Sequence, residues 1–310
     1  MQQEIKKNNF ENLSLTSENH FFMPTTYHLL TRLSKTVFLG LFVILFSCNN
    51  KEQGTIMTDN DANTSIPAPA SIGFTILNAI PHDTAAFTQG LIIYNGVFIE
   101  STGLVGQSSL RKVNMQSGKV EKQYNLSKEI FAEGLTVFND TIYQLSWQNK
   151  LVFQYDANTL KPLGSLPWSG EGWGITNNDK ELIISEGSDK LYFVQPGNLK
   201  LNRVLSVRDN YGPVNNLNEL EVVDGYIYAN RWQYEYIIKI DPVSGLVVGL
   251  INMQDLLLKN TKKDLSYLKN RGATPTEAGA VLNGIAYDKD KKIFYITGKL
   301  WPEIFEVKLN

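Results

Sequence analysis

The chain has 310 residues and a formal net charge of −2, and its acidic and basic residues are interspersed. A chain without a basic patch lacks the electrostatic signature of nucleic-acid binding, so no nucleic-acid partner is expected. Cysteine occurs only at Cys48, and His82 is the only histidine beyond the N-terminal leader. These counts exclude disulfides and cysteine-based metal sites in the folded part. They also argue against Ser-His-Asp hydrolases and multi-histidine zinc sites.

Residues 1–48 are interpreted as a leader with a lipoprotein-type signal peptide, although the polar residues before Met23 are unusual for a signal. Arg32 and Lys35 precede an apolar run over 36–46 that is short for a membrane span and has the length of a signal-peptide core. The following Leu45-Phe46-Ser47-Cys48 resembles a bacterial lipobox, whose cysteine is diacylated. We therefore expect export and anchoring through Cys48 to a bacterial membrane, on its periplasmic or surface face. The alternative is a plain anchor helix with an incidental cysteine.

Residues 49–71 are rich in small and polar residues and have no hydrophobic period, which predicts a flexible tether. Residues 72–310 then continue without a break in composition and form one predicted domain.

That domain contains a repeated three-residue motif. Its first position varies, its second is glycine in all copies but one, where glutamate replaces it, and its third is aliphatic. The copies recur mostly at intervals of about 40 to 45 residues. They are Gln89-Gly90-Leu91, Glu133-Gly134-Leu135, Trp173-Gly174-Ile175, Asn218-Glu219-Leu220 and Asn283-Gly284-Ile285. Each begins a unit of short β-rich segments separated by turns such as Asn95-Gly96. Four antiparallel strands per unit of this length predict an all-β, five-bladed propeller.

The last unit provides a topological prediction. It has segments for only three strands, over 284–287, 294–297 and 304–309. In the other units, the fourth strand lies just before the motif of the next unit. The segment over 72–79 lies in the same place relative to the first motif. We therefore expect the N-terminal strand to complete the last blade and close the ring.

An insertion over about 252–280 separates the fourth and fifth motifs. Met253, Leu256, Leu257, Leu265 and Leu268 have helical spacing, and Pro275 ends the pattern. This segment is either a lid or a brace.

The first strand of each propeller blade lines the central channel, so one repeat position forms a ring around the axis. Here that ring is Gln89, Glu133, Trp173, Asn218 and Asn283. Four polar side chains and a tryptophan at this position favour a site for a polar ligand over a packed core. The alternative is a channel that is merely solvated. Trp147 and Trp232 each follow a ring residue by the same spacing, and Phe87 and Phe131 precede ring residues. These aromatic residues either wall a pocket or pack within blades.

Glu133 is the candidate for proton transfer. A carboxyl group beside indole rings loses solvation of its charged form, which raises its pKa toward neutrality. The alternative is a carboxylate that is paired with a base or caps backbone amides. Glu100, Glu171, Glu186, Glu219 and Glu221 are competitors, with blade bracing expected for Glu219. His82 is interpreted as a loop or cap residue rather than a base.

Seven motifs occur in order between residues 81 and 309. They are Phe87-Thr88-Gln89-Gly90-Leu91, Glu100-Ser101-Thr102-Gly103-Leu104, Gly106-Gln107-Ser108-Ser109-Leu110, Glu133-Gly134-Leu135-Thr136, Gly170-Glu171-Gly172-Trp173-Gly174, Leu217-Asn218-Glu219-Leu220-Glu221 and Thr297-Gly298-Lys299-Leu300-Trp301-Pro302. Together they closely resemble the glutamine cyclotransferases of the plant and bacterial type, which are five-bladed propellers. The resemblance weakens over 252–280.

The resemblance implies an acyltransferase of the aminoacyltransferase kind, a glutaminyl-peptide cyclotransferase. It would convert the N-terminal glutamine of peptides to pyroglutamate and release ammonia, without a cofactor or catalytic metal. Glu133 matches the family's catalytic carboxylate, and Gln89, Asn218 and Lys299 match polar pocket residues. We assign catalytic roles to Glu133, Asn218 and Lys299. The substrate-binding residues are then Phe87, Gln89, Phe131, Trp147, Trp173 and Trp232.

Two rival interpretations remain. The first is a non-catalytic, lipid-anchored propeller that presents its channel mouth to a partner. The second is a six- or seven-bladed lactonase or dehydrogenase, which five repeats disfavour. We expect the protein to be a monomer.

Overall fold

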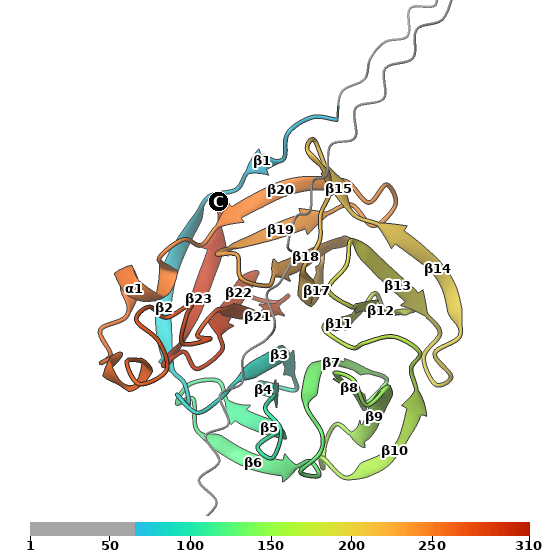
Figure 1. Cartoon of the computed structure of the whole chain (residues 1–310), viewed down its shortest axis with the longest axis horizontal. Coiled ribbons are helices and arrows are strands. Elements are labelled where there is room, and N and C mark those ends of the chain that lie inside the picture. Colours follow the sequence, from blue (N-terminus) through green and yellow to red (C-terminus); the bar gives the residue numbers. More distant parts are fainter. Residues whose placement is uncertain (1–65) are drawn as a thin grey trace, which may run out of the picture. The chain divides into compact units, whose positions relative to one another are not determined.

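The computed structural model describes residues 66–310. Five sheets surround a central axis as the blades of a propeller, and the chain passes around the ring from one blade to the next (Figure 1). The predicted five-bladed, all-β fold is confirmed. The leader, Cys48 and most of the tether lie outside the described residues. Within residues 66–310, no helix has the length and apolar character needed to cross a membrane.

Blades one to four are built from four consecutive antiparallel strands, of which the innermost comes first in the chain. Blade one consists of β3 (Thr88–Tyr94), β4 (Val97–Thr102), β5 (Ser109–Asn114) and β6 (Val120–Asn125). Blade two consists of β7 (Ala132–Phe138), β8 (Thr141–Ser146), β9 (Leu151–Asp156) and β10 (Pro162–Pro167). Blade three consists of β11 (Ile175–Asn177), β12 (Leu182–Ser185), β13 (Lys190–Val194) and β14 (Leu201–Ser206). A two-stranded hairpin, β15 (Arg208–Asp209) and β16 (Gly212–Pro213), follows it.

Blade four consists of β17 (Leu217–Val223), β18 (Tyr226–Arg231), β19 (Tyr236–Ile240) and β20 (Val247–Asn252). Blade five contains β21 (Leu282–Asp288), β22 (Ile293–Gly298) and β23 (Glu303–Leu309) from the end of the chain. Its outermost strand is β2 (Phe74–Pro81), which pairs antiparallel with β23 from Phe74↔Leu309 to Pro81↔Glu303. The prediction that the N-terminal strand closes the ring is therefore confirmed.

The N-terminal end of the described chain also attaches to blade four. Ala70 and Ser71 form β1, which pairs in parallel with β20 opposite Gly249 and Leu250. The predicted tether extended to residue 71, but its last two residues belong to a sheet. The segment from β1 to β2 therefore links the outer edges of blades four and five.

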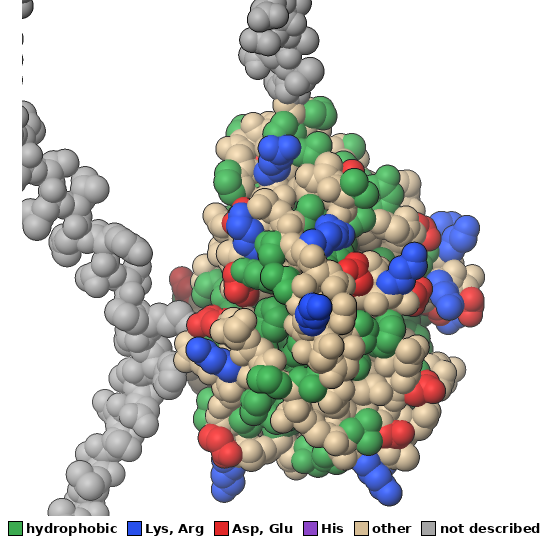
Figure 2. All heavy atoms as spheres, turned by 90° about the vertical axis from the view of Figure 1, so that its right-hand side faces the viewer, with side chains coloured by type: hydrophobic (Ala, Val, Ile, Leu, Met, Phe, Trp, Pro, Cys, Tyr) green, Lys and Arg blue, Asp and Glu red, His purple; other side chains and the backbone are tan. Residues whose placement is uncertain are grey.

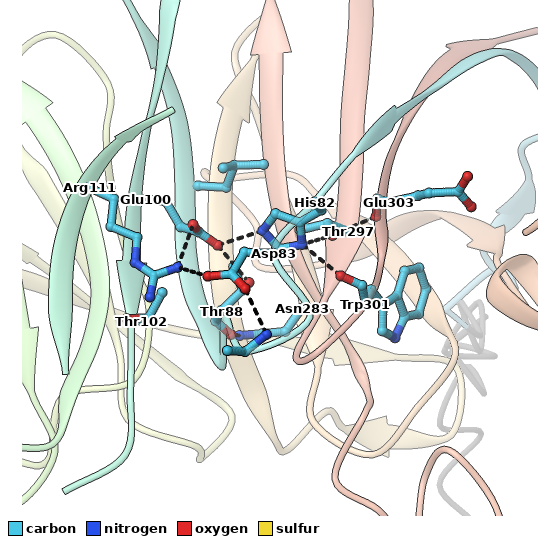
Figure 3. A network of polar contacts seen from close by, with 12 residues as sticks. His82, Asp83, Thr88, Glu100, Thr102, Arg111, Asn283, Thr297, Trp301 and Glu303 are labelled. Atoms are coloured by element: carbon cyan, nitrogen blue, oxygen red, sulfur yellow. Dashed lines mark hydrogen bonds and ion pairs between the residues drawn. The ribbon is translucent and has the colours of Figure 1, made fainter. Parts of the chain in front are cut away.

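A buried polar cluster around His82 holds the first and last blades together (Figure 3). His82 follows β2, and its Nε2 lies 2.9 Å from Oε1 of Glu100 on β4 in blade one. Its Nδ1 lies 2.9 Å from the carbonyl oxygen of Trp301 in blade five. Because both ring nitrogens face acceptors, both must carry protons for both bonds to form, which favours the imidazolium. His82 therefore lies in the loop after β2, as expected, and its buried ring joins the two blades at the ring closure.

The electrostatic surroundings agree with that charge state. Burial alone would lower the pKa of His82, but the charge and hydrogen bond of Glu100 outweigh it and raise the pKa above 6.5. Burial alone would raise the pKa of Glu100, but His82 and Arg111 lower it below 4.5. Arg111 also donates to Asp83 at 2.9 Å. The cluster is therefore a chain of alternating charges across the closure.

The blades pack through apolar side chains and, near the axis, through close backbone contacts. Phe98 of blade one and Tyr295 of blade five lie edge to face, 5.1 Å between ring centroids. At the axis, a Cβ added to Gly134 would lie 2.8 Å from Cα of Gly174, and one added to Gly174 would lie 1.8 Å from the carbonyl oxygen of Asn218. These glycines allow neighbouring innermost strands to approach.

The insertion packs against blade five. It contains α1 (Leu256–Asn260) and a 3-10 turn, η1 (Ser266–Leu268), so only part of the predicted helical spacing forms helix. Its apolar side chains are buried in one cluster with Leu300 and Trp301. In this structure the segment is packed as a brace. The face shown in Figure 2 carries acidic and basic side chains interspersed among hydrophobic ones.

Candidate active site

Four ring residues occupy β-bulges in the innermost strands. The strand register shifts between Thr88 and Gly90, Ala132 and Leu135, Leu217 and Leu220, and Leu282 and Ile285. These shifts place Gln89, Glu133, Asn218 and Asn283 at the irregular positions. Bulges re-aim side chains and are frequent beside active sites. In blade three, Trp173 lies just before β11 and donates its backbone N–H to Ser185 at 3.0 Å.

Glu133 is buried, with 7% of the residue exposed. Among residues 66–310, its carboxyl group receives no hydrogen bond and forms no close ion pair. Burial raises the pKa of Glu133 to about 8, with a further rise from the charge of Glu171 and an opposing effect of Lys299. The predicted elevation of its pKa is thus present, and its cause is desolvation.

Lys299 lies in the turn after β22 and is also buried. Its Nζ donates to Oε1 of Gln89 at 2.6 Å and lies 4.7 Å from the centre of the Phe87 ring. Burial lowers the pKa of Lys299 to about 8, although the negative charge of Glu133 opposes that fall. Burial therefore shifts the pKa values of the carboxyl group and the amine of this site in opposite directions.

The turn that carries Lys299 is held from three sides. The next residue, Leu300, has a positive φ of 62°, which a branched side chain rarely adopts. Its N–H donates to the carbonyl of Ala86 at 2.6 Å, and its carbonyl accepts from the Tyr267 hydroxyl at 2.6 Å. The following carbonyl, that of Trp301, accepts from His82. The insertion and the closing segment thus both fix the position of Lys299.

Asn283 orients the amide of Gln89. Its Nδ2 donates to Oε1 of Gln89 at 3.3 Å and to the carbonyl of Thr88 at 3.0 Å. Oε1 of Gln89 therefore accepts from both Asn283 and Lys299. Within the described chain, Oδ1 of Asn283 and Oδ1 of Asn218 are buried without a hydrogen-bond partner. Unpaired buried acceptors are costly, which is consistent with donors supplied by a ligand.

The five predicted aromatic residues are half-buried and form two groups. Phe87 packs edge to face on Phe131 at 6.3 Å, and Phe131 packs on Trp147 at 5.8 Å. Trp173 packs on Trp232 at 5.7 Å. Glu171 joins the groups, since its Oε2 accepts the indole N–H of Trp147 at 3.0 Å and that of Trp173 at 3.3 Å. The five aromatic side chains and Glu171 therefore form one connected series of contacts.

The structure thus brings most of the predicted residues together. Gln89 and Lys299 are in contact, Phe87 lies under Lys299, and Glu133 interacts electrostatically with Lys299. The Asn218 side chain makes no hydrogen bond to the others among the described residues. Sequence reasoning missed the connecting role of Glu171, although its position two residues before Trp173 was a signal.

The other competing carboxylates have separate surroundings. Glu100 belongs to the His82 cluster, and Glu186 accepts from the Tyr192 hydroxyl. Glu219 accepts the backbone N–H of Leu91 at 3.3 Å and of Ile285 at 2.9 Å, so it bridges blades one and five as expected. Burial raises the pKa of Glu221 to about 8, and this residue lines a different cavity.

That cavity, of about 1130 Å³, is formed by the hairpin turns at the opposite end of the innermost strands. Its lining includes Asn95, Asp140, Asp179, Asp224 and Asp290, but none of the ring residues. Within residues 66–310, no group of three or more His, Cys, Asp or Glu side chains is arranged to hold a metal ion.

Comparison with known proteins gives concordant results. A family model described as glutamine cyclotransferase matches residues 49–309. A glutaminyl-peptide cyclotransferase from Arabidopsis thaliana is 37% identical over 237 residues, which cover 76% of this chain and 71% of the relative. The crystal structure of Myxococcus xanthus glutaminyl cyclase superposes with a TM-score of 0.69 at 36% identity. The match covers 78% of this chain and 98% of the Myxococcus xanthus chain.

Proposed function

Because the chain belongs to the glutamine cyclotransferase family, we propose that it is a glutaminyl-peptide cyclotransferase, an aminoacyltransferase acting on peptides and proteins with N-terminal glutamine. It would convert that glutamine to pyroglutamate and release ammonia. The observation that carries the proposal within the site is Glu133, a buried carboxyl group with no hydrogen-bond partner in the described chain, on which the charges of Lys299 and Glu171 act.

The reaction forms one bond and breaks one bond within a single substrate residue. The α-amine nitrogen attacks the γ-carbonyl carbon, and the bond from that carbon to the amide nitrogen breaks. The enzyme therefore has mainly to fold the glutamine into a near-attack geometry, a task suited to flat aromatic walls. Phe87, Phe131, Trp147, Trp173 and Trp232 are proposed to provide those walls.

Glu133 is proposed to transfer the proton. It takes a proton from the α-amine as the amine attacks and delivers one to the departing amide nitrogen, which leaves as neutral ammonia. The protonated α-ammonium group of a peptide, which must lose a proton before the nitrogen can attack, ordinarily has a pKa of about 7.7 to 8.0. A carboxyl group with a pKa of about 8 exchanges protons with this amine at little free-energy cost.

Lys299, Gln89 and Asn218 are proposed to stabilise the oxygen of the tetrahedral intermediate. Lys299 supplies a positive charge, and its contact with Oε1 of Gln89 leaves the Gln89 Nε2 group available as a donor. Donors aimed at a developing oxyanion in a buried site are among the strongest catalytic groups. The unpaired Oδ1 of Asn283 is suited to accept an N–H of the substrate amide.

The alternative function is a non-catalytic binding module with the same channel. The deciding experiment incubates purified protein with Gln-Ala and with Asn-Ala and measures ammonia and the loss of the free amine. We expect release from Gln-Ala alone, since the asparagine peptide lacks one methylene group and cannot form the five-membered lactam. Absence of release from Gln-Ala would favour the binding module.

We also propose that the protein is exported and anchored to a bacterial membrane through Cys48, as a monomer. The support is the lipobox-like Leu45-Phe46-Ser47-Cys48 after the apolar run. Metabolic labelling with a fatty-acid analogue should label the unaltered protein and leave Cys48→Ala unlabelled. Equal labelling of both would reject the anchor.

A further inference from the structure

We propose that Glu171 is a positioning residue of the cyclisation site, where its carboxylate fixes the indoles of Trp147 and Trp173 and its charge acts on Glu133. This inference rests on the proposed function and assigns a role to a residue outside the predicted catalytic and binding set. Glu171 lies in the loop between β10 and β11, at the junction of blades two and three.

One oxygen of the Glu171 carboxylate accepts hydrogen bonds from two tryptophan side chains. Trp147 comes from the loop after β8 in blade two, and Trp173 precedes β11 in blade three. Both indole N–H groups converge on Oε2 of Glu171, at 3.0 and 3.3 Å, while Oε1 accepts from Nε2 of Gln148 at 3.2 Å. An indole nitrogen can only donate, so without this oxygen each indole would need another acceptor.

The loop itself is fixed from both sides. The backbone carbonyl of Glu171 accepts the indole N–H of Trp168 at 3.0 Å. The next residue, Gly172, donates its N–H to the carbonyl of Trp147 at 3.2 Å. A Cβ added to Gly172 would lie 2.7 Å from the carbonyl oxygen of Ser146, so the backbone passes close to blade two. These contacts fix the backbone that carries the Glu171 carboxylate.

Glu171 also acts on Glu133 through charge. Two charged groups face Glu133: Lys299, from the turn after β22, and Glu171, from the loop before β11. Lys299 favours the ionised carboxylate, whereas Glu171 disfavours it and raises the pKa of Glu133. Loss of the Glu171 charge should therefore lower the pKa of Glu133. A wall residue without an electrostatic role would not have this effect.

The test uses Glu171→Gln, which keeps the shape and one acceptor oxygen but removes the charge. Glu186→Gln is the matched control, because Glu186 is also half-buried but binds the Tyr192 hydroxyl instead of the indoles. With Gln-Ala as substrate, we expect kcat/KM to fall about tenfold in Glu171→Gln as the walls lose their alignment. We also expect the rise of kcat/KM with pH to move to lower pH. The control should match the unaltered protein in both respects.

A second readout does not require catalysis. In a nitrogen-15 NMR spectrum, the indole N–H signals of Trp147 and Trp173 should shift in Glu171→Gln and remain in place in Glu186→Gln. A further variant, Trp173→Phe, removes one indole donor but keeps the Glu171 charge. It should lower kcat/KM without moving the pH profile.

The outcomes separate this inference from the proposed function. If the unaltered protein releases no ammonia, the proposed function fails and this role fails with it. If the unaltered protein is active but Glu171→Gln leaves either the pH profile or the two indole signals unchanged, the positioning role alone is overturned.

Discussion

Glu133 and Lys299 illustrate how burial shifts the pKa values of two ordinary side chains in the way the proposed reaction needs. Each loses solvation, and the consequences are opposite: the pKa of Glu133 rises to about 8 and that of Lys299 falls to about 8. Their mutual attraction limits both changes but does not cancel them. These shifts bring both pKa values closer to neutral pH, as the proposed proton transfer requires.

Glu133→Gln should abolish cyclisation, with a fall in kcat of about 10² to 10⁴-fold, because an amide cannot take up the α-amine proton. The free energy of unfolding should not decrease. The elevated pKa of Glu133 means that its ionised form is destabilised in the folded state, so this group reduces stability as pH rises from 4.5 toward 8. The variant should therefore melt at the same temperature or higher at pH 8, as measured by calorimetry.

The control for this variant is Glu121→Gln, an exposed carboxylate on the outermost strand β6. It should retain both activity and melting temperature. If Glu133→Gln lost its activity together with several degrees of melting temperature, Glu133 would be a structural residue and its catalytic role would be rejected.

At the level of the strand, the repeat pattern predicted which residues share the ring, since one period of the sequence is one blade. It did not predict the bulges that contain Gln89, Glu133, Asn218 and Asn283. A bulge arises from the pairing of two strands, and the local sequence does not specify that register. The Glu171 contacts were also hidden, because they connect loops of two different blades.

The Lys299 turn shows the same limit. Its motif was visible in the sequence, but the three groups that hold it come from residues 33 to more than 200 positions away. Leu300 has a strained backbone conformation that persists only when its surroundings impose it. The insertion supplies part of that support through the Tyr267 hydroxyl. We therefore expect the insertion to affect catalysis without touching the substrate.

Tyr267→Phe should test that link. Loss of the hydrogen bond to the Leu300 carbonyl should cost about 1 kcal/mol of stability and loosen the Lys299 turn. We expect kcat/KM for Gln-Ala to fall by about three- to tenfold. Tyr226→Phe, at the opposite end of the channel, should leave activity unchanged. Equal activity of Tyr267→Phe and the unaltered protein would show that this contact does not affect catalysis.

At the scale of the whole molecule, the sequence predicted the closing strand but not the charged cluster beside it. A count of strands revealed the missing outer strand of blade five, and β2 supplies it. His82 gave no comparable signal, because its partners Glu100 and Trp301 are brought together only when the ring closes. The ring is thus closed by backbone pairing and by a buried ion pair.

This closure makes stability depend on pH in a defined direction. The pKa of His82 is raised above 6.5 in the folded state, so its contribution is complete below pH 6.5 and is lost as pH rises through the folded-state value. The pKa of Glu100 is lowered, so its contribution is complete above pH 4.5 and is lost as pH falls through its folded-state value. The pair therefore stabilises the ring most between about pH 4.5 and 6.5.

His82→Gln should remove the alkaline part of this dependence, because glutamine does not titrate. It leaves Glu100 as a buried charge with Arg111 3.9 Å away as its remaining cation, a loss expected to cost about 3 to 5 kcal/mol. Asp83→Asn is the control, since it breaks a half-exposed ion pair of Arg111 whose contribution is about 0 to 1 kcal/mol. Urea unfolding from pH 5 to 9 measures both. Parallel pH curves for the unaltered protein and His82→Gln would mean that His82 does not titrate at the closure.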